Sequence, residues 1–363
     1  MTPTITDVDI AAYPIELASE FPVTYESHSH TEHVFVRLRT DNGLTAYGEG
    51  TALPWFTGEC TETMAAAIER WFAPTLIDTE MDEASKAFEE IRDEIPGNPG
   101  AKSAVDLALW DLRGKAANVP VSTLLGIRHR DEVPVVTTIP GLDATEAADL
   151  ARKRAKAGFS RFKVKATGDI DADVDRIDAV LSAIPPDATL RVDANTGWKN
   201  YPTTRAAVDR LETTEGIEYL EQPVAPERVE DLAAIWAETG IPVYADEAIH
   251  GPADVERIGA DRLAAGCHFK LAKSGSLGDQ AEMANAAARH DLAVTVVSAF
   301  GTSLDVAANL HLSSVVPNLS SGCEFGASYL TEDPADPQLG RDPVMRPPDG
   351  PGLGVTVDDA VFE

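Results

Sequence analysis

The pattern of apolar and polar residues changes about a third of the way along the chain. From residue 132 onward, short apolar runs alternate with amphipathic stretches that have helical spacing. The run EVPVVTTI (132–139) has the length of a strand, and ATEAADLARKRAKAG (144–158) reads as a helix that ends at Gly158, a usual C-cap residue. Such alternation with short connections predicts a parallel sheet covered by helices.

Seven further apolar runs continue this alternation, and five of them end in a charged residue. These charged residues recur at intervals of 24 to 28 residues, which is about the length of one βα unit. The five runs are FKVK (162–165), LRVD (190–193), IEYLE (217–221), IPVYAD (241–246) and CHFK (267–270). Two more runs, LAVTVVSAF (292–300) and the apolar segment at 319–325, complete eight units. We therefore expect a (β/α)8-type barrel over residues 131–330.

The first 130 residues predict an α+β capping domain instead. ITDVDIAAYPIEL (5–17) alternates like a strand, and two β-rich runs flank Asp41-Asn42-Gly43, which is a hairpin signal. A polar and aromatic loop is expected at 19–32. Helical spacing follows at 61–73, 81–93 and 101–117. The Pro-, Gly- and Asp-rich tail (331–363) is expected to fold back onto this domain and complete it.

Acidic residues outnumber basic residues twofold. The chain has 60 Asp and Glu against 30 Lys and Arg, for a net charge of −30, and the acids are spread along its length. A merely well-solvated surface is one interpretation. We favour adaptation to high salt, where screening removes the self-repulsion of such a surface. Because no basic patch is present to neutralise phosphates, nucleic acid is not expected as a partner.

Cysteine usage and the N-terminus predict a cytoplasmic location. The three cysteines, at positions 60, 267 and 323, are far apart and odd in number, which favours a reducing compartment over a disulfide framework. The N-terminal stretch lacks the basic and apolar regions of a signal peptide. No stretch approaches ~20 uninterrupted apolar residues, so no membrane span is expected.

Three of the strand-end charges are carboxylates on consecutive units: Asp193, Glu221 and Asp246. A single acid at a strand end more often caps the following helix. Three in succession at the C-terminal face of a barrel favour a metal site. Oxygen donors suit Mg2+, or alternatively Mn2+, rather than zinc, which prefers His and Cys.

Lysines flank these carboxylates on both sides. Lys165 ends the strand before them, and Lys270 ends the strand after them. Beside a dication and another ammonium, a lysine pKa should fall, which would allow it to act as a general base. Lys163 lies on the same strand face as Lys165, and its positive charge is expected to repel the Lys165 ammonium. Lys273 lies just past its strand, and a solvated loop lysine is an equally open interpretation.

This combination predicts a reaction. A metal that binds a substrate carboxylate can stabilise the enediolate formed when a proton leaves the adjacent carbon. Two lysines on opposite faces can remove that proton and return it. The expected substrate is a small-molecule carboxylate.

The motifs KVK, VDAN, EQP, ADE and FKLAKSG together resemble the enolase superfamily, in its muconate-lactonizing-enzyme subgroup. The resemblance covers nearly the whole chain and includes PDGPGLGV (348–355), which would return to the cap. It implies Asp193, Glu221 and Asp246 as metal ligands and Lys165 and Lys270 as the acid/base pair. It also implies that Asn195 and Glu247 orient those ligands, and that the protein forms a homo-oligomer.

The reaction expected first is that of a muconate cycloisomerase, because CEFGASYLTED (323–333) looks like the cycloisomerase pattern. A racemase or epimerase of N-acylamino acids or dipeptides, or an o-succinylbenzoate synthase-type dehydratase, is the alternative. Glu324-Phe325-Gly326 stands where dipeptide epimerases carry Asp-x-Asp, and Gly301 replaces a glutamate often found after the seventh strand. A non-catalytic binding protein is disfavoured, because all five site positions are filled.

In the resembling family the substrate pocket involves two cap loops, here 16–32 and 51–60, and the end of the eighth strand. The residues expected in it are Phe21, Tyr25, Trp55, Phe56, Ser298, Glu324 and Phe325. The four aromatic residues of the cap could equally belong to the cap core. His28, His30 and His33 could form a second metal site, but their spacing is no firm ligand signature, and we favour a loop that lines the pocket.

Overall fold

A closed barrel of eight parallel strands forms the centre of the protein. The computed structural model describes residues 2–22, 24 and 27–363. The strands β5 to β12 follow one another in chain order, and β12 pairs with β5 to close the sheet. They are β5 (Val133–Ile139), β6 (Arg161–Lys165), β7 (Thr189–Asp193), β8 (Ile217–Glu221), β9 (Val243–Ala245), β10 (Gly266–Lys270), β11 (Ala293–Ser298) and β12 (Cys323–Phe325). The predicted (β/α)8 barrel is confirmed.

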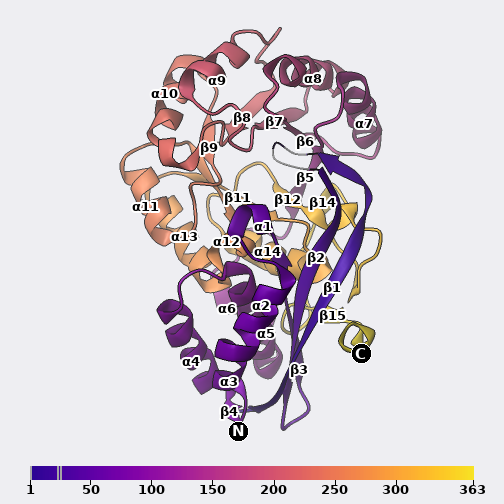
Figure 1. The fold of residues 1–363 in the computed structure, drawn as a ribbon, viewed down its shortest axis with the longest axis vertical. Helices are drawn as coiled ribbons and strands as arrows, with labels where there is room; N and C mark the ends of the chain where they lie inside the picture. The colour runs from indigo at the N-terminus through magenta and orange to yellow at the C-terminus, as the bar shows by residue number, and fades with distance from the viewer. Residues whose placement is uncertain (1, 23, 25–26) are drawn as a thin grey trace.

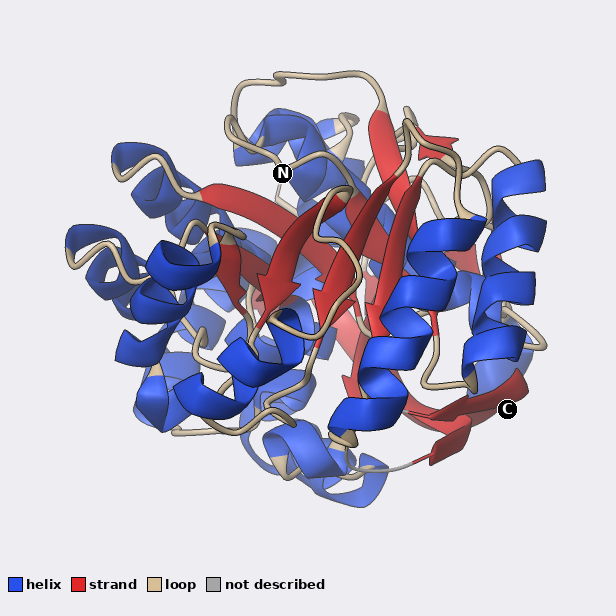
Figure 2. Cartoon of the chain, turned by 90° about the horizontal axis from the view of Figure 1, so that it is seen from above, coloured by secondary structure: helices blue, strands red, loops and turns tan. Residues whose placement is uncertain are grey.

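Helices surround these strands, as the view from above shows (Figure 2). They are α7 (Ala144–Lys156), α8 (Ile170–Ala183), α9 (Tyr201–Val208), α10 (Glu230–Thr239), α11 (Pro252–Ala260), α12 (Leu271–Ser274), α13 (Leu277–Arg289) and α14 (Ser303–Val315), with short 3-10 turns η2 (Pro226–Arg228) and η3 (Gly326–Tyr329). Local sequence explains their ends. The Asp143 side chain accepts from the first amides of α7, and Gly158 adopts a φ of +94° just after it.

Side-chain alternation along the barrel strands separates the core from the site. In β6, Phe162 and Val164 belong to the main apolar core, together with Ile177 and Val180 of helix α8. Lys163 and Lys165 alternate with them and therefore point to the opposite face, into the barrel. The same alternation carries the other strand-end charges into the barrel mouth.

The N-terminal part forms an antiparallel sheet with helices packed on it. The sheet has the order β3-β2-β1-β4. Its strands are β1 (Thr4–Pro22), β2 (Ser27–Thr40), β3 (Thr45–Ala52) and β4 (Thr79–Glu80), and its helices are α1 (Pro54–Thr57), α2 (Thr61–Ala67), η1 (Ile68–Phe72), α3 (Ala73–Leu76), α4 (Met81–Glu94), α5 (Pro99–Ala117) and α6 (Val121–Leu125). The hairpin predicted at residues 41–43 joins β2 to β3, with Gly43 at a φ of +84°. We call this part the cap.

The structure corrects two expectations for the cap. Most of the loop expected at 19–32 is paired strand, because Phe21 pairs with His28 and Pro22 with Ser27. The alternating pattern of β1 continues through the segment once a register shift after Glu16 is allowed. The helix expected at 61–73 is interrupted by the five-residue π-helix η1 before Pro74. Figure 1 shows the long β1–β2 ribbon running from the cap helices up to the barrel loops near β5 and β6.

The C-terminal segment contacts both the barrel and the cap. It contains β13 (Ala335–Asp336), β14 (Val344–Met345), β15 (Thr356–Val357) and η4 (Asp359–Phe362). Strand β14 pairs with β5 of the barrel. On the cap side, the buried Asp111 carboxylate of α5 accepts from the amides of Leu353 (2.8 Å) and Tyr47 (2.9 Å). One carboxylate thus joins the tail, a cap helix and a cap strand.

A buried carboxylate of the cap also holds the start of a barrel helix. Glu49 in β3 accepts hydrogen bonds from the amide (2.8 Å) and hydroxyl (2.5 Å) of Thr302, which precedes α14. The Nδ1 of His33 donates to the same carboxylate at 2.8 Å. Asp305 lies beside it, and burial together with the Glu49 charge raises the pKa of Asp305 to about 7. The cap–barrel junction therefore places two buried acids close together.

Among the described residues, no helix is long and apolar enough to cross a membrane.

The raised pKa of Asp305 predicts a pH dependence of stability. The folded protein binds this proton more tightly than the unfolded chain, whose carboxyl pKa is near 3.9. The stabilisation is therefore complete below about pH 4 and is lost as the pH rises through about 7. This loss is worth roughly 2–4 kcal/mol in the free energy of unfolding. Asp305→Asn, which mimics the neutral carboxyl group, should remove it.

Denaturant unfolding of both proteins between pH 5 and pH 8 measures the effect. The exposed Asp82 of α4, changed to Asn, is the control. Parallel stability curves for the wild type and Asp305→Asn would contradict the assignment.

Candidate active site

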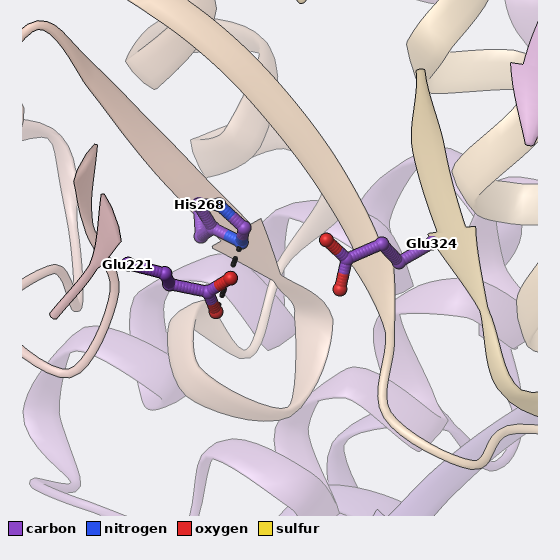
Figure 3. Close-up of side chains that lie close together, drawn as sticks. All are labelled: Glu221, His268 and Glu324. Carbon is purple, nitrogen blue, oxygen red and sulfur yellow. Dashed lines mark ion pairs between the residues drawn. The ribbon is translucent and has the colours of Figure 1, made fainter. Parts of the chain in front are cut away.

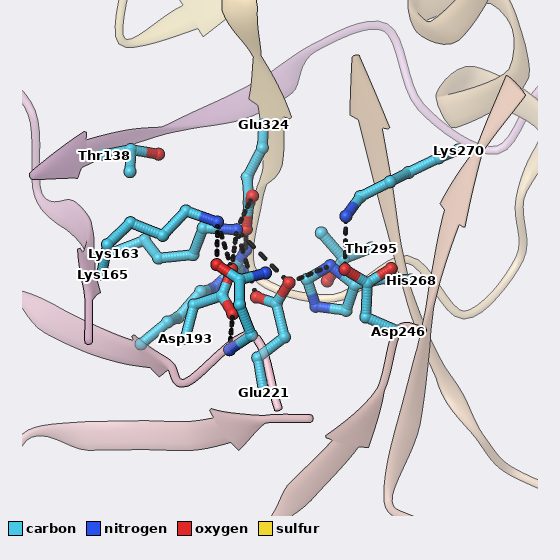
Figure 4. A network of polar contacts seen from close by, with 12 residues as sticks. Thr138, Lys163, Lys165, Asp193, Glu221, Asp246, His268, Lys270, Thr295 and Glu324 are labelled. Carbon is cyan, nitrogen blue, oxygen red and sulfur yellow. Dashed lines mark hydrogen bonds and ion pairs between the residues drawn. The ribbon is translucent and has the colours of Figure 1, made fainter. Parts of the chain in front are cut away.

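The charged strand ends predicted from the sequence do meet at the mouth of the barrel. Lys163 and Lys165 enter from one side, Lys270 enters from the other side, and the carboxylates of Asp193, Glu221 and Asp246 lie between them (Figure 4). The strand register brings the ends level, because Lys165 pairs with Asp193 and Asp193 pairs with Glu221. All three carboxylates are fully buried, so each depends on neighbouring groups to balance its charge.

Lys165 is held by two oxygen atoms. Its Nζ lies 2.5 Å from Oδ2 of Asp193 and 3.0 Å from Oδ1 of Asn195. The amide nitrogen of Asn195 in turn donates to Oε1 of Glu247 at 3.1 Å. Asn195 therefore links the lysine to the next acid along the site. Asn195 and Glu247 were expected to orient the metal ligands, and that role stays a prediction.

Lys163 contacts carboxylates rather than standing free beside Lys165. Its Nζ lies 3.1 Å from both Asp193 Oδ2 and Glu221 Oε2, and it also donates to Glu324. Burial lowers the pKa of Lys163, but Glu221, Glu324 and Asp193 raise it by more, so it lies well above the usual value. The two lysines share one oxygen of Asp193, which weakens the mutual repulsion that the sequence predicted.

Lys270 and Lys273 both bind Asp246. Lys270 donates to Oδ2, and Lys273 donates to Oδ1 at 2.6 Å and to the backbone oxygen of Asp246 at 2.5 Å. Lys273 is only 5% exposed, so the interpretation as a solvated loop lysine is wrong. The short helix α12 directly follows β10, and from it the Lys273 side chain reaches Asp246. Lys273 is thus a buried partner of Asp246.

The electrostatics of the carboxylates fit a divalent cation. Burial raises the pKa of Asp193, but Lys165 and Lys163 outweigh it and keep that pKa below its usual range. Glu221 has less compensation, and burial together with Asp193 raises its pKa well above the usual value. Burial and Asp246 raise the pKa of Glu247 to about 7, and its Oε2 has no hydrogen-bond partner among the described residues. A hard cation would relieve this excess of negative charge.

The pKa of Lys270 also follows from the carboxylates. Burial lowers it, but Asp246, Glu221 and Glu247 raise it by more, so it lies above the usual value. A lowered lysine pKa was predicted from the sequence because an adjacent dication was assumed. Carboxylates alone have the opposite effect.

A layer beneath the site contains a residue that the sequence reasoning missed. Ligand atoms of Glu221, His268 and Glu324 lie within 4.8 Å of one another, and the His268 Nδ1 is 3.4 Å from Glu221 Oε1 (Figure 3). The Lys163 ammonium already supplies a cation there, since it contacts both glutamates. We therefore describe the group as an ion cluster rather than a metal centre. The signal was available, since His268 precedes Lys270 by two residues and so shares its strand face.

A cavity of about 400 Å3 opens above the charged groups. Lys165 and Lys270 both line it. Six residues predicted for the substrate pocket also line it, namely Phe21, Trp55, Phe56, Ser298, Glu324 and Phe325. The seventh, Tyr25, lies outside the described residues. The described aromatic residues of the two cap segments, Phe21, Trp55 and Phe56, therefore border the cavity, and Phe21 also belongs to a small apolar cluster with Ile15, Leu17 and Leu330.

One wall of the cavity is an aromatic cluster that the sequence only half revealed. The ring of Phe21 meets Phe300 at 5.1 Å and Tyr329 at 5.0 Å, both edge to face. Phe300 and Tyr329 come from barrel segments after β11 and β12, so no local pattern joins them to the cap. His28 and His30 also line the cavity, whereas His33 is buried against Glu49. The three histidines therefore do not form one metal cluster.

A cap over the mouth of a (β/α)8 barrel, with acids on three consecutive strands and lysines on both sides, defines an enolase-type barrel enzyme. Residues 5–126 match the family model described as mandelate racemase / muconate lactonizing enzyme, N-terminal domain, and residues 146–361 match the enolase C-terminal domain-like model. The chain therefore belongs to the enolase superfamily, in the mandelate racemase / muconate lactonizing enzyme family. The resemblance seen in the sequence motifs is confirmed.

Characterised relatives span nearly the whole chain. An N-succinyl-L-Arg/Lys racemase of Bacillus cereus is 30% identical over 99% of this chain and 97% of its own length, and its crystal structure superposes with a TM-score of 0.93. Muconate cycloisomerase 1 of Rhodococcus opacus is 33% identical over 90% of this chain and 89% of its own. A dipeptide epimerase from Enterococcus faecalis, solved with Mg and the dipeptide L-Leu-L-Tyr, is 26% identical, covers 98% of this chain and 100% of its own, and has a TM-score of 0.91. The chain is accordingly an isomerase of this superfamily.

The crowded carboxylates predict one Mg2+ site per chain. Calorimetric titration of metal-stripped protein with Mg2+ should show saturable binding. Asp246→Asn should weaken this binding by at least roughly tenfold, because it removes a buried charge at the site. The exposed Asp261, changed to Asn, should bind Mg2+ like the wild type. Absence of saturable heat with the wild type would exclude the three-carboxylate site.

Proposed function

We propose that the protein is a Mg2+-dependent isomerase that removes and returns a proton on the carbon next to a carboxylate. In this proposal Asp193, Glu221 and Asp246 hold the cation. Lys165 and Lys270 exchange the proton, and the cap closes the cavity above them. Mn2+ offers the same preference for oxygen ligands and is an alternative cation.

The placement of the two lysines is the observation that carries the proposal. Lys165 ends β6 and Lys270 ends β10, four strands further around a barrel of eight, and both line the same cavity. Each ammonium is anchored on a different carboxylate, Asp193 or Asp246. A substrate between them would present one face of its reacting carbon to each lysine. This is the arrangement that a 1,1-proton transfer requires.

Each group has a defined part in the reaction. The cation would bind the substrate carboxylate and stabilise the charge that develops on it as the proton leaves. One lysine takes the proton from the α-carbon as a neutral amine, and the other, as an ammonium, donates a proton to the opposite face. Asn195 fixes the position of Lys165 through its 3.0 Å contact. The aromatic cap residues exclude water from the charged groups beneath them.

Racemisation of an N-acylated amino acid is the reaction we favour. The Glu324 carboxylate, at the position where a dipeptide amine would be held, is engaged by Lys163 and Arg191. An acylated nitrogen carries no charge and needs no such partner. The aromatic wall of Phe21, Phe300 and Tyr329 suits an apolar substrate side chain. The full-length similarity to the Bacillus cereus racemase supports the same class.

Cycloisomerisation of a muconate is the second candidate. The sequence ranked it first because of CEFGASYLTED (323–333), and the similarity to the Rhodococcus opacus cycloisomerase supports it. In this reaction only one lysine, Lys165, would exchange a proton with the carbon, and Lys270 would act through its charge. The roles of the two lysines therefore separate the candidates.

Solvent exchange tests the favoured reaction. In D2O with Mg2+, the wild type should exchange the α-proton of both enantiomers of an N-acylamino acid for deuterium. Proton NMR measures this exchange. Lys165→Ala should slow exchange of one enantiomer by about 100-fold or more. Lys270→Ala should slow exchange of the other enantiomer to the same extent. The exposed Lys199, changed to Ala, is the matched control.

N-succinyl and N-acetyl amino acids are tested in parallel with cis,cis-muconate and dipeptides. Each substrate is tested at low and at molar salt, because the net charge of −30 favours adaptation to high salt. Loss of muconate absorbance with formation of a lactone, and no exchange on N-acylamino acids, would support the second candidate instead. If Lys165→Ala retains full activity on whichever substrate is found, the assigned mechanism is wrong.

A further inference from the structure

Thr24, which lies between β1 and β2 of the cap, binds the barrel backbone next to two site residues. The hydroxyl of Thr24 lies 3.1 Å from the backbone oxygen of Ala166 and 3.0 Å from that of Ala194, so it can donate to either. Ala166 directly follows Lys165, and Ala194 directly follows Asp193. One cap hydroxyl therefore bridges the chain segments that carry the first lysine and its carboxylate partner.

The barrel loops approach Thr24 closely. Gly197 lies against Thr24, and a Cβ at position 197 would come within 2.7 Å of the Thr24 methyl carbon and 3.0 Å of the Ala194 oxygen. One loop away, the amide of Gly141 donates to the backbone oxygen of Pro22 at 3.0 Å. Pro22 and Thr24 thus contact the loops after β5, β6 and β7, all on the Lys165 side of the site.

A second cap segment reaches the opposite side. The ring centroid of Phe56, in α1, lies 5.1 Å from the Nζ of Lys270 and 5.9 Å from the Nζ of Lys273. Both distances are within the range of a cation–π interaction. The Phe56 ring covers the cap-facing side of the Lys270 and Lys273 ammonium groups. On the barrel side, both groups bind the Asp246 carboxylate.

We propose that Thr24 and Phe56 are positioning residues, each of which holds one of the two proton-exchanging lysines against its carboxylate from the cap side. Thr24 acts on Lys165 through the backbone after β6 and β7, and Phe56 acts on Lys270 through its ring. The cap then does more than enclose the substrate, because it also fixes the geometry of the proton-transfer pair. The inference rests on the proposed function for the roles of the two lysines. The contacts of Thr24 and Phe56 do not depend on that function.

Chemical labelling tests the proposal without any substrate. Native protein in Mg2+ buffer is treated briefly with acetic anhydride, and acetylation of each lysine is measured by peptide mass spectrometry. Thr24→Val should raise labelling of Lys165 about 2- to 10-fold and leave Lys270 unchanged, as expected for loss of one hydrogen bond. Phe56→Leu should raise labelling of Lys270 about 2- to 30-fold and leave Lys165 unchanged.

Matched controls remove similar groups elsewhere in the cap. Thr79→Val deletes a hydroxyl that donates to the nearby Ile77 oxygen, and Trp71→Leu deletes a ring that is 38% exposed. Both should label like the wild type. Equal increases at both lysines in Thr24→Val or Phe56→Leu would indicate general loosening and overturn the proposal, as would no increase at either lysine.

A second set of variants tests the fit between Thr24 and Gly197. Gly197→Ala should reproduce the labelling of Thr24→Val, because the new methyl group pushes Thr24 away. Thr24→Ser keeps the hydroxyl and should label like the wild type. The double variant Thr24→Ser with Gly197→Ala lacks the clashing methyl of Thr24 and should recover part of the wild-type protection. If Gly197→Ala alone leaves the labelling of Lys165 unchanged, the contact does not position that lysine.

Exchange kinetics then separate this inference from the proposed function. Thr24→Val should slow exchange of the enantiomer that Lys165→Ala affects, and Phe56→Leu should slow exchange of the other enantiomer. If the wild type exchanges neither enantiomer, the favoured function fails, yet the labelling results still decide whether the cap positions the lysines. If exchange is normal but each variant slows both enantiomers equally, the positioning roles are wrong.

Discussion

The mutual neutralisation of buried ammonium and carboxylate groups at the barrel mouth is the interaction on which the rest of the structure depends. Asp193, Glu221 and Asp246 are fully buried, and burying an unpaired carboxylate costs several kcal/mol. Lys163, Lys165, Lys270 and Lys273 offset that cost only because their nitrogens lie within hydrogen-bond range of those oxygens. The strand ends that carry these groups must therefore keep their register.

Closure of the barrel turns this charge cluster into a site with two sides. Three strands lie between β6 and β10 in either direction, so their terminal lysines approach the same cavity from opposite walls. A flat sheet with the same strand order would leave them far apart. The chemistry proposed for the pair is thus a consequence of topology as much as of residue type.

The cap completes this arrangement through polar contacts as well as through its aromatic residues. Glu49 secures the start of α14, and Thr24 and Phe56 reach the two sides of the mouth. The aromatic wall is assembled from the cap and from two barrel loops, so its shape depends on how these parts dock. Under the proposed function, substrate selection would therefore change through cap residues while the charged layer stays the same.

The sequence by itself determined the barrel and the five charged strand ends, because side-chain alternation and the βα period are local properties of the chain. These strand ends in turn predicted the metal and proton chemistry that is proposed here. It could not reveal that Lys273 is a buried partner of Asp246, or that Phe300 and Tyr329 meet Phe21. Those contacts join segments far apart in the chain, and nothing in the spacing along one strand encodes them. Only barrel closure and docking of the cap bring the segments together, and so the tertiary structure decided which groups are buried, which are paired and which line the cavity.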